Sequence, residues 1–118
     1  MLKSYKELTV WQKSIELVKA VYKTTDKLPK HELYVLSVQM RRSAISVPSN
    51  ITEGYKRKSR GEYMQFLRIA YASASELDTQ IIIAKSLYPE ISFDDSEKLV
   101  EEIEKMLATM LKTLNPHP

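Results

Sequence analysis

Cysteine is absent from this 118-residue chain, which excludes disulfide bonds and zinc sites built on thiolates. Only two glycines occur, Gly54 and Gly61, so the sequence has no glycine-rich phosphate loop. No stretch reaches the roughly 20 consecutive apolar residues that a membrane helix requires. The regularly spaced turn residues of a β-sandwich are also missing. The remaining pattern favours one all-α domain whose length is sufficient for a single core.

Four segments carry apolar residues at helical spacing. They predict helices at residues 9–28, 30–56, 61–86 and 94–114 of a single domain covering residues 1–118. The connections are short, so we expect consecutive helices to be antiparallel neighbours in an up-down-up-down four-helix bundle. Pro48 lies inside the second segment and removes one backbone donor. Because the apolar spacing continues past it, we predict a kink at Pro48 and not a break.

The first segment has apolar residues on two adjacent stripes. We predict that the main core stripe consists of Trp11, Ile15, Val18 and Tyr22. A second set lies beside it, namely Val10, Leu17, Val21 and Leu28.

The main stripe of the second segment consists of Leu33, Leu36, Met40, Ala44, Val47 and Ile51, and that of the third consists of Tyr63, Phe66, Ala70, Ala74, Leu77, Ile81 and Ala84. Both segments also carry apolar residues outside these main stripes. These are Tyr34, Val38, Ile45, Met64, Leu67, Tyr71 and Ile82. A helix that is apolar on two sides needs a second partner, so we predict that these residues form the interface of a homo-oligomer. The alternative is that they are ordinary exposed apolar residues, which are common on protein surfaces.

Charge is distributed unevenly along the chain. Residues 1–60 hold 13 Lys or Arg against 5 Asp or Glu, whereas residues 61–118 hold 5 against 10. This asymmetry indicates either a basic face and an acidic face, or neighbouring helices that complement each other. The densest basic run is Lys56-Arg57-Lys58-Ser59-Arg60, which is flanked by Tyr55 and Tyr63.

Basic side chains attract phosphate, and aromatic rings can stack on unpaired bases. We therefore predict a surface that binds RNA or DNA. Its candidate residues are Arg41, Arg42, Lys56, Arg57, Lys58 and Arg60. The alternative for the run at 56–60 is a solvated turn, and the alternative for the protein is an interaction scaffold without a nucleic-acid role.

Polar side chains crowd the segment around Pro48. Asn50 borders the core stripe, where an amide must find hydrogen-bond partners. We predict a structural network in which Glu53 or Glu76 pairs with an arginine and Asn50 bonds to the backbone near the kink. The alternative is a ligand or nucleic-acid site built on the kink.

Catalytic groups are not evident in the sequence. The two histidines are His31, at the start of a helix, and His117, near the end of the chain. Neither completes a Ser-His-Asp set, and no Glu-x-x-His pair of a di-metal bundle is present. We expect a protein that is not an enzyme and that has no catalytic residues, no metal and no cofactor. Residues 1–7 lack the apolar core of a signal peptide, so a cytoplasmic location without membrane contact is expected.

Several of these residues carry a resemblance to a known family. The matching stretches are residues 8–13, 39–44, 46–54, 66–70 and 72–77, including the motif Pro48-x-Asn50-x-x-Glu53-Gly54. They resemble the four-helix-bundle family encoded in intervening sequences of bacterial 23S ribosomal RNA genes. The resemblance covers about residues 5–114. Thr52 stands where that family commonly has alanine.

The resemblance implies a four-helix bundle that assembles as a ring-shaped homopentamer. It implies no established activity. The family is related to the accessory protein of diversity-generating retroelements, a basic pentamer that binds nucleic acid and a reverse transcriptase. The expected partners are other copies of the chain, RNA or DNA, and, by that analogy alone, a nucleic-acid enzyme.

Overall fold

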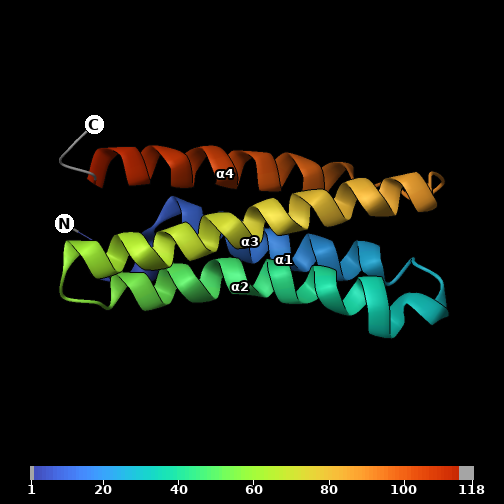
Figure 1. Cartoon of the computed structure of the whole chain (residues 1–118), viewed down its shortest axis with the longest axis horizontal. Helices are drawn as coiled ribbons and strands as arrows, with labels where there is room; N and C mark the ends of the chain where they lie inside the picture. The colour runs from blue at the N-terminus through green and yellow to red at the C-terminus, as the bar shows by residue number, and fades with distance from the viewer. Residues whose placement is uncertain (1, 115–118) are drawn as a thin grey trace.

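The computed structural model describes residues 2–114, which are helical and contain no β-strand. Four α-helices are present: α1 (Thr9–Thr25), α2 (Val38–Tyr55), α3 (Arg60–Leu87) and α4 (Asp94–Leu114). Short helical turns precede α1 and α2, namely the 3-10 turns η1 (Tyr5–Glu7) and η2 (Lys30–Glu32) and the π-helix η3 (Leu33–Ser37). The helices lie side by side along the longest axis, which measures 45 Å (Figure 1).

The packing of the helices follows their order in the chain. α1 contacts α2, α2 contacts α3, α3 contacts α4, and α4 closes the arrangement by contacting α1. All four helices contribute to one apolar core. Its largest fully buried side chains include Leu17 of α1, Met40 of α2, Leu77 of α3 and Ile103 of α4.

The core face of α1 differs from the predicted main stripe. Val10, Leu17 and Val21 are buried, whereas Tyr22 is exposed and Trp11 is only half-buried. Ser14 is fully buried and its hydroxyl donates to the carbonyl of Trp11 at 2.6 Å. This small, internally bonded side chain tolerates burial. The stripe that the prediction placed beside the core is therefore the core stripe.

The segment between α1 and α2 also departs from the prediction. α1 ends at Thr25 and not at residue 28, because Lys27 and Leu28 donate to the carbonyls of Thr24 and Thr25 in tight turns. The predicted regular helix from residue 30 is instead the 3-10 turn η2 followed by the π-helix η3. π-helical turns are uncommon and are often found at functional sites.

α2 continues through Pro48 without interruption, as the apolar spacing predicted. The pyrrolidine ring is buried between α2 and its neighbours. The predicted core positions Met40, Ala44, Val47 and Ile51 are all fully buried. The kink at Pro48 stays a prediction.

α3 corrects part of the predicted oligomer face. Leu67 is fully buried in the core, and only 7% of Met64 is exposed. Both positions lie one residue from the predicted core positions Tyr63 and Phe66, which are only partly buried. The rest of the predicted α3 stripe is confirmed, since Ala70, Ala74, Leu77, Ile81 and Ala84 are all fully buried. Only the first turns of α3 differ from the prediction, and Met64 and Leu67 are therefore not available to a second copy.

Side-chain contacts close the two ends of the bundle. At one end, the ring of Tyr55 makes edge contacts with Tyr5 and Tyr63, at centroid distances of 6.3 and 6.4 Å. At the other end, the hydroxyl of Tyr88 donates to Glu32 at 2.5 Å and lies 3.3 Å from His31. The hydrogen bond to the Glu32 carboxylate raises the pKa of the Tyr88 phenol. The contacts of Tyr88 with Glu32 and His31 tie the segment before α2 to the segment after α3.

Candidate nucleic-acid interface

The basic run forms a tight turn between α2 and α3. α2 ends at Tyr55, and the amides of Lys56 and Arg57 still donate to the carbonyls of Thr52 and Gly54. Ser59 then caps α3, because its hydroxyl accepts a hydrogen bond from the amide of Glu62 at 3.1 Å. The turn is short and capped at its second helix, so its cations are held close together at one end of the bundle.

Aromatic rings lie beneath these cations. The ammonium of Lys56 sits 5.5 Å from the centre of the Tyr5 ring, and the guanidinium of Arg57 sits 4.7 Å from that of Phe66. Such contacts attract a cation to the ring face but leave its charge intact. The tyrosines predicted to flank the run, Tyr55 and Tyr63, pack on each other below the turn. Burial raises the pKa of the Tyr63 phenol.

The four cations of the turn differ in their partners. Arg57 pairs with Glu53 in the last turn of α2 at 3.1 Å, an exposed ion pair of small energetic value. Lys56, Lys58 and Arg60 are exposed and take part in no ion pair among residues 2–114. Their charges are available to an anionic partner. We refer to Lys56, Arg57, Lys58 and Arg60 together as the basic turn.

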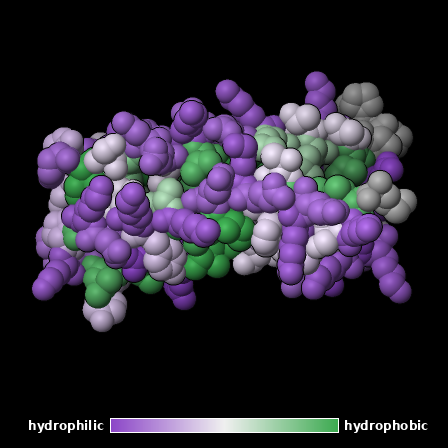
Figure 2. All heavy atoms as spheres, turned by 180° about the vertical axis from the view of Figure 1, so that it is seen from behind, coloured by the Kyte–Doolittle hydropathy of each residue, from purple (hydrophilic) through white to green (hydrophobic). Residues whose placement is uncertain are grey.

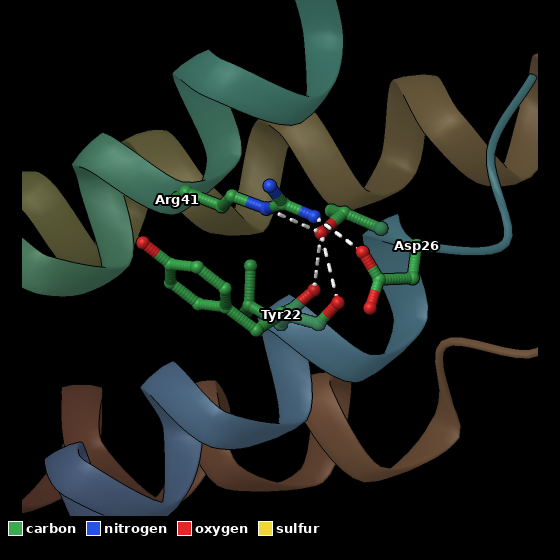
Figure 3. A network of polar contacts seen from close by, with 5 residues as sticks. Tyr22, Asp26 and Arg41 are labelled. Atoms are coloured by element: carbon green, nitrogen blue, oxygen red, sulfur yellow. Dashed lines mark hydrogen bonds and ion pairs between the residues drawn. The ribbon is translucent and has the colours of Figure 1, made fainter. Parts of the chain in front are cut away.

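Arg41 is not part of the basic turn. It precedes Lys56 by fifteen residues on the same helix, which places the two about 22 Å apart along the axis. Its guanidinium donates to the Thr25 hydroxyl at 2.9 Å and to Asp26 at 2.8 Å, and lies 4.6 Å from the Tyr22 ring centre (Figure 3). Arg41 therefore connects the end of α1 to α2, and its assignment to the nucleic-acid surface stays a prediction.

Arg42 is exposed beside Arg41, and both lie apart from the basic turn. They line a hollow of about 310 Å³ between α1 and α2 together with Tyr22, Tyr34 and Ile45. Unlike Arg41, Arg42 has no ion pair among the described residues. The predicted cationic residues thus lie on two surfaces, the basic turn at one end and the two arginines on the α1–α2 face.

The predicted polar network around Pro48 forms only in part. The Asn50 amide donates to the backbone carbonyl of Ser46 at 2.8 Å and to its hydroxyl at 2.9 Å, and that hydroxyl lies 2.7 Å from the Ser73 hydroxyl of α3. Glu53 pairs with Arg57 at the surface. Glu76 is exposed on α3 and has no ion pair within residues 2–114, so it stands outside this network.

A carboxyl pair that the sequence did not reveal lies between α3 and α4. Asp78 and Glu104 line a hollow of about 300 Å³ with Tyr71, Glu101 and Lys105. Desolvation and the neighbouring Asp78 raise the pKa of Glu104 from 4.5 to about 7, and Glu101 adds to this rise. The Ser75 hydroxyl, 3.5 Å from Glu104, acts in the opposite direction. Near neutral pH, the pair therefore holds a proton that an isolated carboxylate would release.

This raised pKa predicts how the stability of a single chain depends on pH. The Glu104 carboxyl binds its proton more tightly in the folded state than at its ordinary pKa of 4.5. The free energy of unfolding should therefore decrease as pH rises through about 7. Because the group is partly solvated, we expect a decrease of only about 1 kcal/mol between pH 5 and 8.

Urea unfolding at a series of pH values, monitored by circular dichroism at low protein concentration, measures this decrease. Glu104→Gln should flatten the profile and should be more stable than the original chain at pH 8. Glu76→Gln removes an exposed carboxylate from α3 and should leave the profile unchanged. If Glu104→Gln kept the full pH dependence, the proton would reside elsewhere.

Four residues of the predicted oligomer face are exposed on the single chain: Tyr34, Ile45, Tyr71 and Ile82. Val38 is half-buried beside them. Tyr34 is extreme, with 86% of its surface accessible on the π-helix η3.

Within residues 2–114, no three ligating side chains gather as a metal site would require. The same residues include no helix with both the length and the apolar character of a bilayer span.

Comparisons with known proteins place this geometry in a family. Residues 6–109 match the family described as 23S rRNA-intervening sequence protein. A crystal structure of a protein with unknown function from the S23 ribosomal protein family of Bacteroides thetaiotaomicron is similar, with 25% sequence identity and a TM-score of 0.79. The similarity covers 87% of this chain and 95% of that chain. No curated protein matches the sequence. Because the family match includes all of α1, α2 and α3 and most of α4, this chain belongs to the family of 23S rRNA-intervening sequence proteins.

Proposed function

We propose that this chain is a non-enzymatic, homo-oligomeric protein of the cytoplasm that binds RNA or DNA through its basic turn. In this proposal the protomer is an up-down-up-down four-helix bundle with α2 bent at Pro48, and the oligomer is a pentamer. The single observation that carries the nucleic-acid role is the basic turn itself. Three of its cations are exposed and have no ion pair within residues 2–114, and the fourth, Arg57, pairs with Glu53 and lies on the Phe66 ring, so that four cations gather within five residues.

The electrostatics of the turn favour a polyanion over a single charged group. Its cations are close together, exposed and unaccompanied by a buried polar pocket, so they match the repeating phosphates of a nucleic-acid backbone. The Tyr5 ring beside Lys56 adds an aromatic surface on which an unpaired base could stack. Binding of this type depends strongly on salt and weakly on sequence.

The oligomeric part of the proposal is supported by uncovered apolar surface. Figure 2 views the molecule from the side opposite to Figure 1 and shows apolar surface near the middle of that face, surrounded by hydrophilic side chains. Separately from that view, Tyr34 of η3, Ile45 of α2 and Ile82 of α3 each leave more than two-fifths of their surface accessible. Assembly would cover this area and would repeat the basic turn in each copy, which strengthens the field that nucleic acid meets.

A salt titration of binding tests the nucleic-acid role. In the variant with Lys56, Arg57, Lys58 and Arg60 all changed to Ala, we expect the affinity for a labelled single-stranded RNA to fall about tenfold or more. The slope of log K against log salt should also become shallower, by up to about 3. Fluorescence anisotropy at two salt concentrations measures both quantities.

The matched control changes Lys19, Lys23, Lys27 and Lys30 to Ala. These lysines are exposed in and after α1, and their removal gives the same net charge. If the control and the basic-turn variant lost affinity equally, binding would reflect total charge and not this turn. If the basic-turn variant kept full affinity, the nucleic-acid role would be rejected.

An interaction scaffold without a nucleic-acid role is the second candidate. It is favoured by the intramolecular pairing of two predicted cations, Arg41 with Asp26 and Arg57 with Glu53. The same titration separates the two functions, because the basic-turn variant of a scaffold would lose no more RNA affinity than the matched control.

A further inference from the structure

Two chemically different surfaces of the bundle remain uncovered. The α1–α2 face contains two adjoining hollows that share Ile45, one beside Tyr22 and Arg42 and the other beside Trp11 and Pro48. The α3–α4 face contains the hollow of the Asp78–Glu104 pair. Tyr71, Asp78 and Ile82 follow one another at helical spacing on this side of α3, so apolar side chains lie on both sides of the carboxyl pair along the helix.

These two faces lie on opposite sides of the protomer. α1 and α2 pack on each other, α3 and α4 pack on each other, and the two pairs are joined through the α2–α3 and α1–α4 contacts. The outer groove of the first pair therefore shares no helix with the outer groove of the second. A contact that joins the two faces must run head to tail, since each copy would use one face for each neighbour.

The charges of the two faces are complementary. Arg41 is already engaged by Asp26, which leaves Arg42 as the cation of the α1–α2 face without an ion pair among residues 2–114. The α3–α4 hollow holds three carboxylates, Asp78, Glu101 and Glu104, against the single cation Lys105. Within one chain, the carboxyl pair relieves its repulsion by keeping a proton. A guanidinium from outside would relieve it instead.

We infer that the α1–α2 face of one copy docks on the α3–α4 face of a second copy, with Arg42 of the first directed at Asp78 and Glu104 of the second. This inference rests on the proposed homo-oligomer and specifies its contact. Ile45 and Tyr34 of one copy then supply apolar surface opposite Tyr71 and Ile82 of the next, and the arginine sets the register between them.

The carboxyl pair also makes the contact sensitive to pH. Arg42 favours the ionised pair, so docking lowers the pKa of Glu104 and is strongest where both carboxyls are charged. The other charged and polar groups facing the pair are Glu101 and Lys105 on α4, with Tyr71 and Ser75 on α3. Self-association should therefore weaken by about tenfold or more when pH falls from 8 to 5.5.

Charge-reversal variants, made singly and in combination, test the inference. Arg42→Glu alone and Glu104→Arg alone should each raise the dissociation constant of self-association by about 100-fold, because each places like charges against one another. The double variant Arg42→Glu/Glu104→Arg should assemble again, since every head-to-tail contact then pairs a glutamate with an arginine, whatever the number of copies in the ring. Sedimentation velocity with the 13.7 kDa protomer as reference measures each state.

The outcomes separate this contact from the proposed function as a whole. If the original chain assembles but both single variants assemble equally well, the contact is elsewhere and this inference is overturned. If each single variant dissociates but the double variant does not recover, the two faces do not meet head to tail, and the inference is again overturned. If the original chain is a monomer at high micromolar concentration, the homo-oligomer itself is rejected, whereas its RNA affinity is still decided by the salt titration.

A folding check and a second variant keep the test valid if one substitution prevents folding. Circular dichroism of each variant reports its helix content, and Arg42 is exposed, so Arg42→Glu should fold normally. If Glu104→Arg does not fold, Ile82→Glu replaces it, because Ile82 is exposed on the same side of α3. This variant should dissociate the assembly, and full retention of assembly would contradict the proposed face.

Discussion

Replacing Leu67 with alanine is expected to lower the free energy of unfolding by about 2–5 kcal/mol, the usual cost of truncating a fully buried leucine. Leu67 has no exposed surface and packs in the core shared by the four helices. Truncation removes its apolar contacts and leaves a cavity that the surrounding helices can fill only in part. Urea unfolding of the variant, at a concentration where the chain is monomeric, measures the loss.

The control for this prediction is Ile82→Ala on the same helix. More than half of the Ile82 surface is accessible, so its truncation should change the stability of the monomer by less than about 0.5 kcal/mol. A Leu67→Ala variant that unfolds like the original chain but no longer self-associates would contradict the structure. That result would mean that Leu67 lies in the interface between copies, as the sequence predicts.

Replacing Gly54 with alanine is the second substitution with a large expected effect. A Cβ atom at this position would lie 2.9 Å from the Cβ of Phe66 and 3.1 Å from the carbonyl oxygen of Tyr63. Neither atom is the tip of a flexible side chain, so α2 and α3 would have to separate. We expect a loss of about 1–3 kcal/mol from this overpacking, which outweighs the gain in helix propensity of at most about 1 kcal/mol.

Gly61 provides a matched control for Gly54. It lies in the first turn of α3, and an added Cβ would meet no atom within 4 Å. Gly61→Ala should therefore raise the midpoint of thermal unfolding slightly, through helix propensity and the reduced freedom of the unfolded chain. If both alanine variants shifted the midpoint of thermal unfolding in the same direction, the close approach of α2 and α3 would not be the reason that position 54 requires glycine.

Helical periodicity predicts the elements of this chain well where one stripe is clearly more apolar than the others. α4 begins and ends at the predicted residues, and the α2 stripe of Met40, Ala44, Val47 and Ile51 is the observed core. α1 is apolar on two adjacent stripes, so spacing alone could not rank them. The observed choice buries Ser14, a residue that hydropathy places outside a core.

The candidate site shows the same division between local and long-range information. The basic turn could be predicted because its cations are consecutive, and the Ser59 cap has a local signature. The ion pair between Arg41 and Asp26 could not be predicted, because it depends on how the end of α1 packs on α2. The Asp78–Glu104 pair likewise requires the register between α3 and α4, which no spacing within either helix determines.

The chain contains a single tryptophan, and its position has a practical consequence. The Trp11 indole donates to the Thr52 hydroxyl at 3.0 Å and lines the outer hollow of the α1–α2 face. Its emission spectrum therefore arises from one environment, partly wet in an isolated chain. A protein or peptide settling on that hollow would shift the emission to shorter wavelength, so an unlabelled sample can report occupancy of this face by intrinsic fluorescence.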